Sequence, residues 1–268
     1  MSQEVNEGVE RAHREGILTA ASLMVGGAAA DDAMRRARLL PSLRVGLHLV
    51  LVDGRPVLPP ERIPHLVAGD GRLRSDLAMA GIEMFVRPSA RRELAAEIEA
   101  QFAAYHATGL PLDHVDAHHH FHLHPTVCAQ VLTIGRRYGM KALRVPREPG
   151  DIVRRLDTDA SHRRGWLTGP WVTLLARRVR RHGLTAPQRV FGLAWSGAMT
   201  EERIARLLQN LPEGLTEIYC HPAVDVARGA ASGCRGTDEL AALIAPGVKQ
   251  LLLASGARTG GFADFASS

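Results

Sequence analysis

The segment from Asp113 to Pro125 reads Asp-His-Val-Asp-Ala-His-His-His-Phe-His-Leu-His-Pro. Imidazoles at this density are typical of a metal site, and the alternative is a histidine-rich loop in solvent. The segment follows a predicted strand, and parallel α/β folds place their active sites at the carboxyl ends of strands. Asp116 and His118 share one side if the strand continues, so the carboxylate can orient a ligating imidazole. We therefore predict a metal site at His118 with Asp116 supporting it.

Two further histidines lie at strand positions elsewhere in the chain. His48 interrupts the aliphatic run Leu-His-Leu-Val-Leu, where a core role and a ligand role are the two alternatives. His221 ends a predicted strand as His-Pro, where an imidazole can act as general acid or base and the alternative is a turn residue. Separated histidines with a carboxylate beside them are typical of hydrolytic metal sites. The sequence has neither a Gly-x-Ser-x-Gly elbow nor a phosphate loop to favour another chemistry.

The elements that must position these residues alternate between strand and helix. The predicted strands cover 18–25, 43–52, 112–117, 140–145, 190–195 and 215–220. The predicted helices cover 5–16, 31–40 with an Asp31 cap, a segment from Ser89 to before Gly109, 125–139, one capped by Thr200, and 237–244. Alternation of this kind indicates parallel strands with right-handed crossovers. Because no glycine fingerprint follows a first strand, we expect a barrel rather than a doubly wound sheet, with residues 53–88 as an irregular excursion.

Length and composition limit the class of protein. A chain of 268 residues with 46% apolar content is expected to form one domain over residues 1–268. No stretch is apolar enough for a membrane span, so we expect a cytoplasmic protein. The three cysteines favour neither a disulfide framework nor a thiolate zinc site. The net charge of +5 comes mostly from arginine and does not by itself indicate a partner; we expect no nucleic acid.

Four motifs resemble, in order and spacing, those of the YdjC-like carbohydrate deacetylases. They are Gly46-Leu47-His48, Asp116 to His120 with His122, Leu143-Arg144-Val145-Pro146, and Glu217 to Pro222. The similarity covers nearly the whole chain, and within the family it is nearest to the hopanoid biosynthesis-associated members.

The resemblance implies a distorted TIM-like barrel of about seven parallel strands and hydrolytic removal of an acetyl group from an N-acetylated amino sugar, on a hopanoid glycolipid in the nearest branch. It implies one divalent ion, Mg²⁺ or Zn²⁺, bound by His48 and His118, with His221 protonating the departing amine. Asp116, His120 and Arg144 would lie beside the metal or the substrate. A homodimer and a peripheral association with the inner membrane through the Arg- and Trp-rich segment 151–182 are further expectations.

The sequence departs from the family pattern at one motif. The family's first strand ends in Ala-Asp-Asp-Phe-Gly, which supplies a carboxylate ligand and a carboxylate base, and this chain matches the pattern only after that motif. We therefore expect the first barrel strand to be missing, with a start assigned too late or a true remnant as the alternatives. Asp116 and Asp225 are the first candidates for a replacement carboxylate. A catalytically inactive metal-binding accessory protein and a metal-dependent phosphoester hydrolase remain competing functions.

Overall fold

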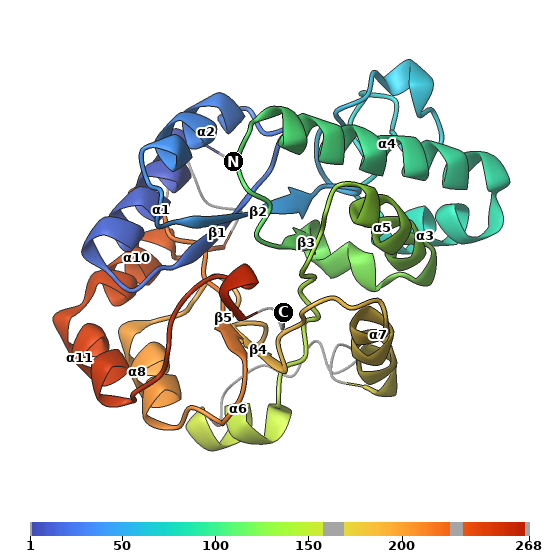
Figure 1. Cartoon of the computed structure of the whole chain (residues 1–268). Coiled ribbons are helices and arrows are strands. Elements are labelled where there is room, and N and C mark those ends of the chain that lie inside the picture. The colour runs from blue at the N-terminus through green and yellow to red at the C-terminus, as the bar shows by residue number, and fades with distance from the viewer. Residues whose placement is uncertain (1, 158–168, 226–232, 266–268) are drawn as a thin grey trace.

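The computed structural model describes residues 2–157, 169–225 and 233–265 (Figure 1). Its strands are all parallel and form two small sheets. The first sheet has the order β1-β2-β3, with β1 at Ala20–Leu23, β2 at Arg44–Leu49 and β3 at Val115–Ala117. The second pairs β4, Arg189–Phe191, with β5, Thr216–Ile218. Parallel neighbours need crossover connections, and helices provide them here, so the alternation predicted from the sequence is confirmed.

The expected closed barrel of about seven strands is not what the described residues form. The segment predicted as a strand at 140–145 makes single bridges, Val115 with Leu143 and Ala142 with Thr185, instead of a ladder. Pro146, Pro149 and Pro187 lie near these bridges, and proline has no backbone N–H to extend a ladder. The bridges still connect the two sheets into one curved arrangement, because Val190 also donates its N–H to the carbonyl of Arg147.

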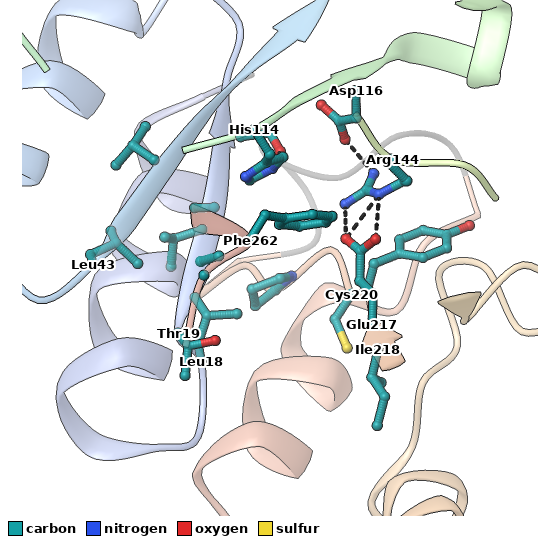
Figure 2. Close-up of a pocket in the computed structure, with 18 of the residues that line it drawn as sticks. Leu18, Thr19, Leu43, His114, Asp116, Arg144, Glu217, Ile218, Cys220 and Phe262 are labelled. Carbon is teal, nitrogen blue, oxygen red and sulfur yellow. Dashed lines mark hydrogen bonds and ion pairs between the residues drawn. The ribbon is translucent and has the colours of Figure 1, made fainter. Parts of the chain in front are cut away.

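An open side remains between β1 and β5. Each of these strands is the last of its sheet, and within the described ranges no strand pairs with its second edge. Residues of both strands line one cavity of about 1060 Å³. Figure 2 shows side chains from both sides pointing into this cavity. The curved sheet is therefore interrupted at one place, where there is space for more chain.

The helices lie outside the strands (Figure 1), and several of them pack on other helices, as α3 does on α4 and α11 on α8. The α-helices are α1 Gln3–Glu15, α2 Ala30–Arg38, α3 Leu77–Val86, α4 Pro88–Ala107, α5 Pro125–Arg137, α6 Gly150–Leu156, α7 Pro170–Arg181, α8 Glu201–Gln209, α10 Gly236–Ile244 and α11 Pro246–Ala254. Short 3₁₀ turns are η1 Pro60–Arg62, η2 His118–Leu123 and η4 Ala263–Phe265. None of the described helices is long and apolar enough to cross a bilayer.

Several helix ends follow the local chemistry of the sequence. Pro125 begins α5 at the first helical position, and Thr200 caps α8 by accepting the N–H of Arg203, so both predictions are confirmed. The prediction that Asp31 caps a helix is wrong, because α2 already begins at Ala30. Asp32 instead accepts hydrogen bonds from Asn6 and from arginines one turn later, which ties α1 to α2.

The segment 53–88 is not wholly irregular, because it contains α3. Asp76 caps this helix by accepting the N–H groups of Ala78 and Met79. Apolar residues occur all round α3, so its sequence has no amphipathic period to indicate a helix. Segment 151–182 forms α6 and α7 in its described parts, and residues 158–168 lie outside the described residues.

Candidate active site

The parallel register of β2 and β3 places His48 directly opposite Asp116. His48 Nδ1 lies 2.9 Å from Asp116 Oδ1, so the carboxylate accepts the Nδ1 proton and leaves Nε2 available to a ligand. The sequence predicted that Asp116 orients the imidazole of His118. The imidazole is that of His48 rather than His118, because β3 ends at Ala117 and the chain turns there.

Asp116 is held in place by a buried arginine that bridges two carboxylates. Arg144 donates to Asp116 Oδ2 through Nη1 and to both carboxylate oxygens of Glu217, with Nε at 2.9 and 3.0 Å (Figure 2). Burial would raise the pKa of Asp116, but the charges of Arg144 and His48 hold that pKa well below its ordinary value. A chain of charged contacts therefore runs from Glu217 through Arg144 and Asp116 to His48.

The loop after β3 changes direction through two strained residues. His119 and His120 have positive φ angles of 52° and 54°, a backbone region that residues other than glycine seldom adopt. This turn brings the His118 and His119 rings to a centroid distance of 4.1 Å, and the His118 ring lies 5.7 Å from that of His48. Burial, together with the charge of His48, lowers the pKa of His118 to about 4, so this imidazole is neutral near pH 7. A neutral imidazole is the form that binds metal.

Asp53 supplies a carboxylate that the sequence analysis did not select. It follows β2, has a positive φ of 49°, and its Oδ2 lies 3.1 Å from His119 Nε2. One ligand atom each from Asp53, His118 and His119 lie within 4.8 Å of one another, a donor set that fits a divalent ion. The Asp53-Gly54 pair after an aliphatic strand is the sequence signal that could have indicated this position.

The other predicted site residues lie around this cluster, with different partners. His221 lines the same cavity as His118, and its main-chain N–H donates to Glu239. Tyr219 separates the two sides of the mouth, with ring centroids 5.4 Å from His221 and 5.9 Å from His120. Asp225 is exposed on the chain after β5 and is not in the donor cluster.

A family model described as YdjC-like protein matches residues 1–254. The chain belongs to this family. Among curated YdjC-like relatives, a carbohydrate deacetylase of Geobacillus stearothermophilus is 32% identical over 250 residues, covering 91% of this chain and 85% of that protein. A carbohydrate deacetylase of Brevibacillus brevis is 29% identical over 257 residues, covering 94% and 90%.

The fold of this YdjC-like chain also resembles a solved structure. A crystal structure from Enterococcus faecalis, described as that of a candidate cellobiose-phosphate cleavage protein, superposes with a TM-score of 0.76. The match covers 99% of this chain and 95% of the other at 24% identity, so it supports the fold alone. The family predicted from the four motifs is thus confirmed, and the hopanoid-associated branch stays a prediction.

Proposed function

We propose that this YdjC-like chain is a metal-dependent carbohydrate deacetylase that removes an N-acetyl group from an amino sugar. The observation that carries the proposal is the group of Asp53, His118 and His119 donors at the carboxyl ends of β2 and β3, with His48 beside them. Curated relatives that match nearly the whole chain are carbohydrate deacetylases, which supports the same reaction class.

The proposed metal ligands are His118, His119 and Asp53, whose donor atoms cluster, together with His48 beside them; the Asp53 carboxylate lowers the charge of the ion. Mg²⁺ and Zn²⁺ are the candidate ions, since the donors combine nitrogen and oxygen. A divalent ion held there would polarise the amide carbonyl of the substrate. His48 presents Nε2 because Asp116 fixes its tautomer, and Arg144 fixes Asp116 in turn.

His221 is the proposed general acid. It follows β5 and lines the same cavity as His48 on β2 and His118 at the start of η2, which suits a proton donor to the departing amine. Such a donor converts a poor amine leaving group into a neutral one as the carbon–nitrogen bond breaks. We propose that His120 and Tyr219, whose ring centroids lie 5.9 Å apart, contact the sugar.

The substrate we propose is an amino sugar carried on a lipid of the hopanoid type, which follows from the narrower resemblance. The same resemblance supports a peripheral association with the inner membrane through residues 151–182, and a homodimer. The basic helix α7 in this segment supports the membrane association, because Arg178, Arg180 and Arg181 are exposed.

We further propose that the complete site includes one more strand between β1 and β5. The cavity of about 1060 Å³ lies there, and both strands that border it have an edge without a partner among the described residues. A strand that fills the gap would end at the same mouth as β2 and β3 and could add the Asp-Asp pair of the family pattern. Asp116 and Glu217 are both bound to Arg144, so neither is free to act as base.

Metal content and acetate release test the proposal together. The chain should bind about one Zn²⁺ or Mg²⁺, and Asp53→Asn and His118→Ala should each lose it, because removing a ligand usually abolishes a site. His182→Ala changes an exposed histidine of α7 and serves as the matched control. Metal binding unchanged in both site variants would contradict the ligand assignment.

The reaction is tested with an N-acetylated chitooligosaccharide. A polypeptide extended by the proposed strand should release acetate at a rate roughly 100-fold to 10,000-fold above that of residues 1–268 alone, the usual contribution of a general base. Equal rates would show that the extra strand is unnecessary. Bound metal with no acetate release from either polypeptide would favour the inactive accessory protein.

A further inference from the structure

Helix α3 exposes an unusual set of apolar side chains. Met79, Ile82, Phe85 and Val86 are 50–62% exposed, while Ala80, Gly81 and Met84 on the opposite side are buried. The exposed residues recur at helical spacing and so cover one side of the helix. Large apolar groups gathered on one face of a protein indicate an interaction surface rather than ordinary surface composition.

The exposed apolar surface continues onto the start of α7. Trp171 and Leu174 are 38% and 53% exposed. The indole Nε1 of Trp171 donates to the Leu123 carbonyl at 2.9 Å. His124, which follows Leu123 in the chain, packs its ring against that of Phe85, with the two ring centroids 6.3 Å apart. The two helices therefore flank the same two residues. We define the apolar face as Met79, Ile82, Phe85, Val86, Trp171 and Leu174.

Cations border the apolar face, and carboxylates there are few. The Arg91 guanidinium lies 6.0 Å from the centre of the Phe85 ring, and Arg87 and Arg92 beside it are exposed. Helix α7 contains no acidic residue and carries its arginines one turn after Leu174. The two acidic residues of α3 and its cap already have partners. Asp76 caps the helix, and Glu83 lies 4.0 Å from the Arg74 guanidinium.

We infer that the apolar face docks on an anionic lipid bilayer. Exposed aliphatic and aromatic groups insert at the boundary of headgroups and acyl chains, tryptophan prefers that depth, and bordering arginines bind anionic headgroups. A second copy of the chain is a poorer occupant, because a twofold contact through the same face would bring the two sets of arginines together.

The position of the face relative to the donor cluster fits a lipid-linked substrate, and this step rests on the proposed function. Phe85 and Trp171 contact the end of η2, and His118 and His119 lie at the start of the same turn. Figure 1 shows α3 and α7 on one side of the molecule and α11 on the opposite side. A bilayer against the apolar face would therefore lie close to the mouth that holds the cluster.

Sedimentation with vesicles tests the docking without any turnover. The unmodified chain should bind vesicles that contain phosphatidylglycerol and bind much more weakly to pure phosphatidylcholine. The double variant Ile82→Asp/Phe85→Asp should lower the partition coefficient on anionic vesicles by on the order of tenfold or more. Leu253→Asp changes an 81% exposed leucine of α11 and should bind like the unmodified chain. Equal binding by the double variant would overturn the inference.

Three further measurements keep the result interpretable. Arg87→Gln/Arg92→Gln leaves the apolar residues intact and should also weaken binding to anionic vesicles, so the inference stays testable if the aspartate variant fails to fold. Sedimentation velocity tests whether a second copy of the chain occupies the face instead. If the aspartate variant loses a dimer but binds vesicles as before, the face mediates self-association. Acetate release from a soluble chitooligosaccharide should not change in either variant. Failure of a polypeptide extended by the proposed strand to release acetate would contradict the proposed function but not the docking.

Discussion

At the residue scale, the site depends on charges that are buried together. Arg144 is 8% exposed and forms ion pairs with both Asp116 and Glu217. Asp116 is only 1% exposed. Removing one member of such a group leaves a charge without compensation, which costs more than the intact group contributes. The orientation of His48 therefore depends on a residue that does not contact it.

Replacing Arg144 tests this dependence. Arg144→Met should lower the free energy of unfolding by roughly 3–5 kcal/mol at pH 7, because Asp116 and Glu217 lose their common partner. Urea denaturation followed by circular dichroism measures the loss. Arg155→Met, which removes an exposed ion pair with Asp151, is the matched control and should leave the midpoint almost unchanged. Similar midpoints for the two variants would show that the buried network contributes little.

The role of His221 can be separated from metal binding. His221→Ala should keep its divalent ion and lose roughly 100-fold or more in the rate of acetate release, the usual scale for a general acid. Metal analysis and an acetate assay on the same preparation give the two numbers. If the variant loses its ion instead, His221 is a ligand and not the acid.

At the scale of elements, β1, β2 and β3 are held together by a polar layer below the donor cluster. His114 bonds Ser22 Oγ at 2.9 Å and Asp113 at 2.7 Å, and its ring lies over Gly46. A Cβ at Gly46 would lie 2.5 Å from the imidazole, so only glycine allows this ring between the strands. The same glycine belongs to the Gly-Leu-His motif of β2, which gives that motif a packing reason.

Substitution of this glycine should therefore disturb the sheet. Gly46→Ala should destabilise the fold by roughly 1–3 kcal/mol, since the buried His114 ring has to move to relieve the overlap. Gly69→Ala is the matched control, because a Cβ there has no neighbour within 4 Å. Thermal unfolding compares the two variants. A control as unstable as Gly46→Ala would show that the effect is not due to packing against His114.

At the scale of the whole molecule, buried imidazoles link the stability of the fold to pH. His122 is fully buried, and its Nε2 lies 2.7 Å from the Arg144 carbonyl. Burial lowers the pKa of His122 from 6.5 to about 4, so between these pH values the unfolded chain binds a proton that the folded chain does not. The contribution of His122 to the free energy of unfolding is therefore fully present above pH 6.5 and is lost as the pH falls toward 4.

The contribution of His122 should be on the order of 3 kcal/mol across that window. His122→Gln keeps a donor near the Arg144 carbonyl but does not titrate, so its free energy of unfolding should fall less between pH 6.5 and 4. Urea titrations at several pH values measure both proteins. Parallel pH profiles would contradict the assignment of this loss to His122.

The sequence alone determined those features that depend on local pattern and order. Alternating apolar runs and helical spacing predicted most strands and helices, since periodicity reflects which side chains are buried. Pro125 and Thr200 marked helix starts through their own backbone chemistry. The four motifs identified the family, and the resemblance predicted His48 and His118 as metal ligands and His221 as the general acid.

Only the tertiary structure decided which of these residues meet, because contact across strands depends on register and turns rather than on spacing. The β2–β3 register paired Asp116 with His48, and positive φ angles at Asp53 and His119 brought those two side chains together. How far each side chain is buried depends on the tertiary packing and not on local pattern. Burial lowers the pKa of His118, and the packing leaves apolar residues of α3 exposed. Prolines around the Leu143 bridge limited strand pairing that the apolar run alone had favoured.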